Sequence, residues 1–151
     1  MAEELIVKNS IHINAASSRI WDALVNPEQT KKYMFGCEAI SEWKKGSSLL
    51  WKGTYEGKEM IFVKGDIIDI QPEKYLAYTV IDPNNPNLED KPENYLTVTI
   101  TLSPGNSGTD LTVTQGDYNK VGDGPNRYKH TIDSGGWDPI LVQIKKLVEE
   151  K

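Results

Sequence analysis

The sequence predicts an α+β domain in which a curved antiparallel sheet wraps around a long C-terminal helix. Six strand-like segments follow one another in the middle of the chain, and their short turns make neighbouring strands antiparallel. Apolar residues alternate with threonine along the last strands, which gives the sheet one apolar face. The final segment, from about Pro125 to Glu150, has helical periodicity and is the long element left to cover that face.

Size and charge limit the classes of function. The chain has 151 residues, the size of one domain, and we assign residues 1–151 to a single unit. The net charge of −5 argues against a general nucleic-acid or anionic-membrane surface, because both require a basic face. Cys37 is the single cysteine, and neither a signal peptide nor an apolar run of about 18 residues is present. We therefore expect a cytoplasmic protein with no nucleic-acid or membrane partner.

The first strand and two short helices open the chain. In "LIVKNSIHIN", Val7, Ile11 and Ile13 fall on one side and polar residues on the other, which predicts a strand. In "AASSRIWDALVNPEQTKKYMF" the apolar residues follow helical spacing. Asn26 and Pro27 end one short helix and open another, with Asn26 as the cap and Pro27 in the first position.

Six further strands are expected. Leu111 and Val113 alternate with threonines in the last of them, so one face turns to the core and the other to water. Most of the connections are short turns rich in glycine, proline or charged residues, and one longer loop, "DPNNPNLEDKPEN", precedes the fifth strand. The six segments are "CEAISEW", "SLLWKGTY", "MIFVKGDIIDI", "YLAYTVI", "YLTVTITL" and "TDLTVTQG".

The C-terminal helix contains residues that helices tolerate poorly. Pro139 cannot donate to the carbonyl of Gly135, which predicts a kink or break nearby. Gly136 falls on the apolar stripe, so either a strand comes close there or a space stays open. A functional role for this glycine and a role in packing alone are equally compatible with the sequence. The stripe expected to face the sheet consists of Ile132, Gly136, Ile140, Ile144, Leu147 and Val148.

Several stretches together resemble one known family. They include "INAASSRIWDAL", "SEWKKGSSLLWKGTYEGKEM", "KGDIIDIQPEKYLAYT", "DKPENYLTVTITL", "LTVTQGDYN" and "GGWDPILVQIKKLVE", and they cover nearly the whole chain in the family's order. The sequence resembles the activator-of-heat-shock-protein-ATPase-like branch of the START/birch-pollen-allergen (SRPBCC) superfamily, which has the helix-grip fold. This resemblance implies a cavity between the sheet and the long helix that a small apolar ligand can enter.

The residues expected to line this cavity follow from strand and helix positions. Alternation places Tyr78 on an inward face, and Gln115 shares the inward parity of Leu111 and Val113. An inward amide needs hydrogen-bond partners, which a ligand, a buried water or Tyr78 could supply. Core packing without ligand contact is the alternative for each aromatic residue, and a leucine at Gly136 is expected to block the cavity without disturbing the fold. The predicted ligand-binding residues are Tyr33, Phe35, Leu49, Trp51, Tyr55, Tyr78, Gln115, Ile132 and Gly136.

The sequence does not indicate catalysis. His12 points away from the core by alternation, and His130 is expected on a helix surface without a nucleophile. Cys37 has no recognisable base and is interpreted as a small apolar filler. The spacing typical of metal ligands is absent, so we expect no catalytic residue, no metal and no cofactor.

Three functions remain open. The first is non-catalytic binding of a small hydrophobic or aromatic molecule. The second, implied by the resemblance, is a chaperone-interacting module similar to an activator of heat-shock protein ATPase, which belongs to the stress response. It ranks below ligand binding because the chain resembles one of the two domains of the eukaryotic co-chaperone. The third is an enzyme of the cyclase or aromatase type that the superfamily also contains.

Overall fold

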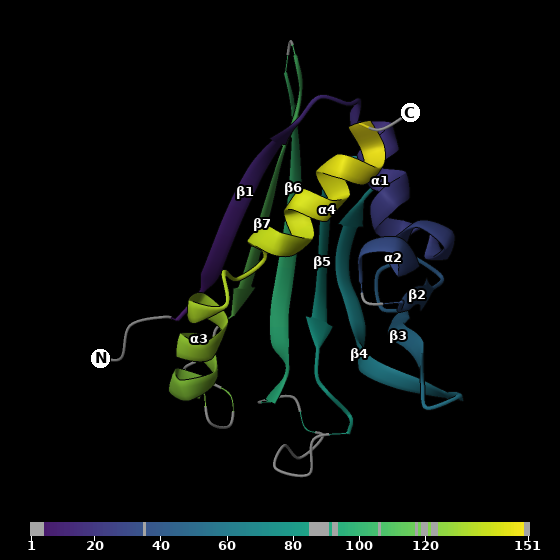
Figure 1. Cartoon of the computed structure of the whole chain (residues 1–151), viewed down its shortest axis with the longest axis vertical. Coiled ribbons are helices and arrows are strands. Elements are labelled where there is room, and N and C mark those ends of the chain that lie inside the picture. The colour runs from purple at the N-terminus through teal and green to yellow at the C-terminus, as the bar shows by residue number, and fades with distance from the viewer. Residues whose placement is uncertain are drawn as a thin grey trace.

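The computed structural model describes residues 5–34, 36–84, 91, 94–105, 107–116, 118, 121 and 124–149. Within these ranges the chain forms one antiparallel sheet of seven strands and four α-helices (Figure 1). In chain order the elements are β1 (Val7–Ile13), α1 (Ser17–Val25), α2 (Pro27–Tyr33), β2 (Glu38–Ser41), β3 (Ser48–Tyr55), β4 (Lys58–Gln71), β5 (Tyr75–Val80), β6 (Leu96–Gly105), β7 (Gly108–Gly116), α3 (Gly124–Asp133) and α4 (Asp138–Glu149).

The strand order of the sheet is β1-β7-β6-β5-β4-β3-β2. Strands β2 to β7 pair in sequence, as predicted from connections that are mostly short, and β1 adds to β7 with Val7 opposite Gln115. Helix α4 crosses one face of the sheet diagonally, running from the side of β1 towards α1 (Figure 1). This arrangement confirms the predicted α+β helix-grip fold.

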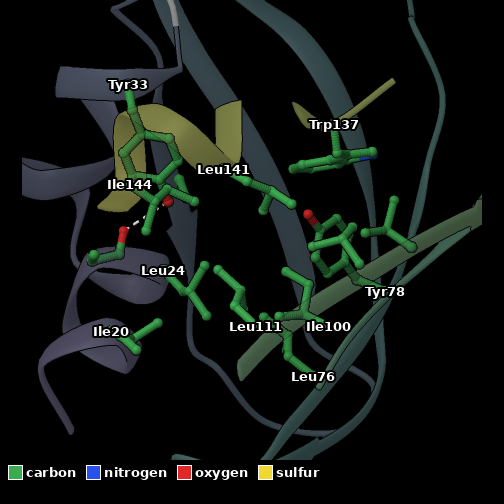
Figure 2. Packing of buried hydrophobic residues seen from close by; sticks show 14 of the residues in the cluster. Ile20, Leu24, Tyr33, Leu76, Tyr78, Ile100, Leu111, Trp137, Leu141 and Ile144 are labelled. Carbon is green, nitrogen blue, oxygen red and sulfur yellow. Dashed lines mark hydrogen bonds between the residues drawn. The ribbon is translucent and has the colours of Figure 1, made fainter. Parts of the chain in front are cut away.

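The core lies between that face of the sheet and helices α1 and α4. In Figure 2, Trp137 and Tyr78 occupy one end of the cluster and Tyr33, Ile20 and Ile144 the other. The alternation of apolar residues with threonine along β6 and β7 is confirmed, because the apolar side chains are buried and their threonine neighbours are largely more exposed. The sheet therefore contributes one apolar face, as its pattern predicts.

The predicted helical stripe is only partly correct. Ile144 and Val148 are 1% and 5% exposed, as expected, and Ile140 is half-buried. Ile132 is 46% exposed, so its assignment to the sheet-facing stripe is wrong. The helical phase does not continue from α3 into α4, and Leu141, which is fully buried, joins Ile144 and Val148 on the face that meets the sheet.

The predicted break lies between α3 and α4. Gly135 and Gly136 have φ angles of +95° and +59°, a region that residues with a Cβ rarely adopt. Pro139 falls in the first turn of α4, where its missing N–H leaves no helical bond unmade. The two glycines therefore end one helix and redirect the chain, and the proline starts the next.

Gly136 allows a strand to come close. A Cβ built at this position would lie 2.5 Å from Asn9 Oδ1 and 2.9 Å from Val7 Cγ1, both on β1. Close approach of a strand, one of the two explanations that the sequence left open, is therefore observed, and Gly136 also borders an open cavity. The expectation that a leucine at Gly136 would leave the fold intact is wrong, because its side chain would collide with β1.

Local signals at the start of the chain are confirmed. The Asn26 side chain accepts a hydrogen bond from the Glu28 N–H at 3.0 Å, and Pro27 is the first residue of α2. The Tyr33 hydroxyl donates to the Ala23 carbonyl at 2.7 Å, which joins the end of α2 to α1. The Thr30 hydroxyl on α2 accepts from the Ala39 N–H on β2 at 3.0 Å, which holds α2 beside the sheet.

The far end of α4 is joined to the end of β1 by polar contacts. Lys145 Nζ donates to the His12 carbonyl at 3.0 Å, and Glu149 accepts from the Asn14 N–H at 2.7 Å. The exposed His12 ring points away from the core, as predicted, and its hydrogen bond with Asp110 raises the pKa of the imidazole. These contacts hold the C-terminal end of α4, the end opposite the helix break, against β1.

Candidate functional site

A cavity of about 420 Å³ lies between the sheet, the end of α2 and the junction of α3 with α4. This volume falls within the roughly 300–1,000 Å³ typical of small-molecule sites. Most of the wall is apolar or aromatic, and no Asp, Glu, Lys, Arg or His occurs among the described residues that line it. The lining residues are Met34, Cys37, Trp51, Phe62, Val63, Tyr78, Val80, Val98, Gln115, Tyr118, Thr131, Gly136, Trp137 and Ile140.

One row of the sheet forms part of the wall. Tyr78 on β5 pairs with Val98 on β6, which pairs with Gln115 on β7. Because neighbouring strands lie about 4.8 Å apart, Tyr78 and Gln115 are separated by roughly 10 Å across this row. The two polar side chains therefore lie on either side of an apolar valine.

A β-bulge brings Phe62 into the wall. The register between β3 and β4 shifts after Trp51, which pairs with Val63, so that Phe62 is the extra residue. Its ring lies over Gly53, where a Cβ would be 2.9 Å from the ring and 3.2 Å from Cys37 Sγ. The absence of a side chain at Gly53 thus makes room for both Phe62 and Cys37.

Gln115 is held at both ends of its amide by other parts of the chain. The Trp137 indole N–H donates to Gln115 Oε1 at 2.8 Å, and Gln115 Nε2 donates to the Tyr118 hydroxyl at 2.9 Å. The Trp137 backbone N–H donates to Asn9 Oδ1 at 2.9 Å. The predicted need of Gln115 for partners is confirmed, but Trp137 and Tyr118 supply them in place of the expected ligand, water or Tyr78.

Helix α3 supports the Tyr118 end of this network. The Tyr118 ring packs edge-on against Tyr128, with 5.8 Å between centroids, and the Arg127 guanidinium lies 5.9 Å from its centroid. Both contacts come from α3, whose side chains are otherwise mostly exposed. The network therefore connects β1, β7, α3 and the start of α4 at one side of the cavity.

The Tyr78 hydroxyl, unlike the Gln115 amide, is not held by other side chains of the described residues. Tyr78 is 3% exposed, yet its hydroxyl has no hydrogen-bond partner in the described part of the chain. Every fully enclosed side-chain nitrogen or oxygen there does have a partner, so this hydroxyl keeps contact with open space, which the cavity provides. Burial raises the pKa of Tyr78, so the phenol remains neutral at physiological pH.

Cys37 is half-buried and lies in the cavity wall, one residue before β2. Burial raises the pKa of its thiol, which disfavours the reactive thiolate. No group of three or more His, Cys, Asp or Glu side chains suited to a metal ion occurs among the described residues. In the same ranges, no helix has the length and apolar character needed to cross a bilayer.

The structure brings some of the predicted residues to the cavity and not others. Tyr33 and Leu49 are buried in the core outside the wall of this cavity, and Ile132 is exposed on α3 because of the helix break. Phe35 and the side chain of Tyr55 lie outside the described residues. Four predicted residues line the cavity: Trp51, Tyr78, Gln115 and Gly136.

Several lining residues were not predicted. Phe62 depends on the bulge, and Trp137 on the helix break, so strand or helix periodicity could not indicate either. A signal for Trp137 did exist, because a large aromatic residue directly follows two glycines in "SGGWDP". The other unpredicted members of the wall are Met34, Cys37, Val63, Val80, Val98, Tyr118, Thr131 and Ile140.

Comparison with known proteins gives consistent results. The profile of the family described as "Activator of Hsp90 ATPase homolog 1-like protein" matches residues 14–149. The solution structure of protein ChR145 from Cytophaga hutchinsonii is 38% identical, with a TM-score of 0.76 over 99% of this chain and 97% of that one. No curated protein is significantly similar in sequence.

Two more distant structures share the fold. The Aha1 dimer from Colwellia psychrerythraea is 16% identical, with a TM-score of 0.69 over 95% of this chain and 96% of that one. CalU16 from Micromonospora echinospora is also 16% identical, with a TM-score of 0.61 over 95% of this chain and 74% of that one. At these identities the similarity concerns the fold alone.

Proposed function

Because the chain belongs to the activator of Hsp90 ATPase homologue 1-like family of the SRPBCC superfamily, whose members share a fold without sharing one chemistry, we propose a function from its cavity. The protein binds a small hydrophobic or aromatic molecule without transforming it. The observation that carries this proposal is the cavity of about 420 Å³ with an apolar, uncharged wall.

The composition of the wall supports binding in two ways. Apolar surface that a ligand removes from water contributes roughly 25 cal/mol per Å², before the entropic cost of association. The rings of Trp51, Phe62 and Trp137 also offer faces and edges to an aromatic ligand. The described lining offers no carboxylate or imidazole for acid–base chemistry, and burial keeps the Cys37 thiol protonated, so binding is favoured over catalysis.

A cavity-filling variant tests the proposal. Val80 lines the cavity and is half-buried, so Val80→Phe places a ring into the open volume. We expect uncharged aromatic compounds to shift the NMR signals of the Trp137 indole N–H and of Trp51 in the natural protein, and Val80→Phe to weaken binding at least tenfold. The measurement is an NMR titration with a panel of aromatic polyketides, flavonoids and lipids.

Val142→Phe is the matched control. Val142 is 38% exposed on α4 and does not line the cavity, so the same substitution adds the same ring outside the site. Its affinity should equal that of the natural protein, and thermal unfolding should show that both variants fold. Failure of every compound to shift cavity signals, or equal binding by Val80→Phe, would refute the proposal.

A chaperone-interacting module is the second candidate, and the family description favours it. The charged residues available for such an interaction lie outside the cavity, and the net charge is −5. An interaction through exposed charges should weaken as salt increases, because screening acts over about 8–10 Å at physiological ionic strength. Calorimetric titration with an Hsp90-type chaperone should then show binding that falls with salt. Absence of binding at low salt would remove this candidate.

A further inference from the structure

We propose that Tyr78 determines ligand specificity, and that the cavity selects uncharged aromatic molecules carrying a hydrogen-bond acceptor such as a ketone oxygen. This inference rests on the proposed binding function and assigns a chemical class to the ligand. It follows from which polar groups of the wall already form hydrogen bonds within the protein.

The Gln115 amide and the other two hydroxyls of the wall, those of Tyr118 and Thr131, have partners within the protein. The Trp51 indole N–H, like the Tyr78 hydroxyl, has none in the described part of the chain. Both ends of the Gln115 amide are held by Trp137 and Tyr118, and the Tyr118 hydroxyl accepts one of these bonds. The Thr131 hydroxyl donates to the Arg127 carbonyl at 2.9 Å. Tyr33, another buried tyrosine of the core, donates to the Ala23 carbonyl. These groups orient one another and stiffen the wall.

Among the hydroxyl groups that line the cavity, that of Tyr78 has no hydrogen-bond partner in the described residues, although the residue is only 3% exposed. A ligand that fills the cavity excludes water from this hydroxyl, which leaves a buried donor without an acceptor unless the ligand supplies one. A neutral hydrogen bond of this kind changes affinity by about three- to tenfold. The ligand should therefore carry an acceptor that reaches the Tyr78 hydroxyl.

The ligand should also be uncharged. Burial keeps Tyr78 protonated, so it acts as a neutral donor. The described wall contains no lysine, arginine or histidine that could pair with an anion, and no carboxylate that could pair with a cation. Burying an unpaired charge in such a wall is strongly unfavourable. A ketone, ester or quinone oxygen fits these conditions, and a carboxylate does not.

Three naphthalene probes that differ in one group test this selection on the full chain. They are 2-acetylnaphthalene, with a carbonyl acceptor, 2-ethylnaphthalene, without one, and 2-naphthoate, with a negative charge. Dissociation constants come from NMR titration followed at the Trp137 indole N–H. We expect the ketone to bind about three- to tenfold tighter than the ethyl compound, and the carboxylate to bind weaker than both.

Tyr78→Phe removes the hydroxyl and retains the ring, so it should abolish the preference for the ketone. Tyr75→Phe, on the same strand but outside the cavity wall, should retain it. Equal affinity of the natural protein for the two uncharged probes, or an unchanged preference in Tyr78→Phe, would overturn this inference while leaving the binding function intact. If neither uncharged probe binds, this inference fails, and the proposed function fails with it when no compound of the panel binds either.

Discussion

Replacing Ile144 with alanine is expected to lower the free energy of unfolding by about 2–5 kcal/mol. Ile144 is 1% exposed and belongs to the cluster between α4 and the sheet (Figure 2). The substitution removes buried apolar atoms and leaves a cavity that the surrounding side chains fill only in part. Urea denaturation, monitored by tryptophan fluorescence and circular dichroism, measures the change.

Val142→Ala is the control for this experiment. Val142 is on the same helix but 38% exposed, so its truncation should change the free energy of unfolding by no more than about 0.5 kcal/mol. Both substitutions place alanine in a helix, which makes the difference between them a measure of burial. Equal losses for the two variants would show that α4 does not pack on the sheet as described.

Replacing Gly136 with alanine is expected to destabilise the fold through two effects. The left-handed backbone conformation, with φ of +59°, costs a residue with a Cβ about 1–2 kcal/mol. The added Cβ would also lie 2.5 Å from Asn9 Oδ1 and 2.9 Å from Val7 Cγ1, and such overpacking costs about 1–3 kcal/mol. The free energy of unfolding from urea denaturation measures the sum.

Gly135→Ala separates the two effects. Gly135 also has a positive φ, but a Cβ there would meet Pro139 Cδ at 3.5 Å, an ordinary contact. This variant should therefore lose stability through backbone strain alone. In an Asn9→Ala background, the cost of Gly136→Ala should fall because one colliding atom is gone, which a double-mutant cycle measures. If this cost is the same in both backgrounds, the proposed close contact with β1 is incorrect.

The sequence determined the elements of this protein and their order. Alternation along β1, β6 and β7 is a local property, because each side chain's face follows from its position in a strand. Asn26 and Pro27 mark a helix boundary through bonds and torsion angles of their own neighbourhood. The mostly short turns between consecutive strands then indicate an antiparallel sheet. The C-terminal helical segment is the element that remains to cover its apolar face.

Tertiary structure decided which residues form the cavity wall and which groups in it are already paired. Asn9 and Gly136 lie near opposite ends of the sequence but meet in the fold, and Gln115 bonds to Trp137 because the helix break turns that indole towards β7. Phe62 enters the wall through a register shift between two strands. Each of these contacts depends on where separate elements cross. Local periodicity carries no information about how far apart those elements lie. For the same reason, Gln115 was expected to need a ligand, a water or Tyr78 as a partner, although Trp137 and Tyr118 already hold it. The wall hydroxyl for which the described residues supply no partner is that of Tyr78.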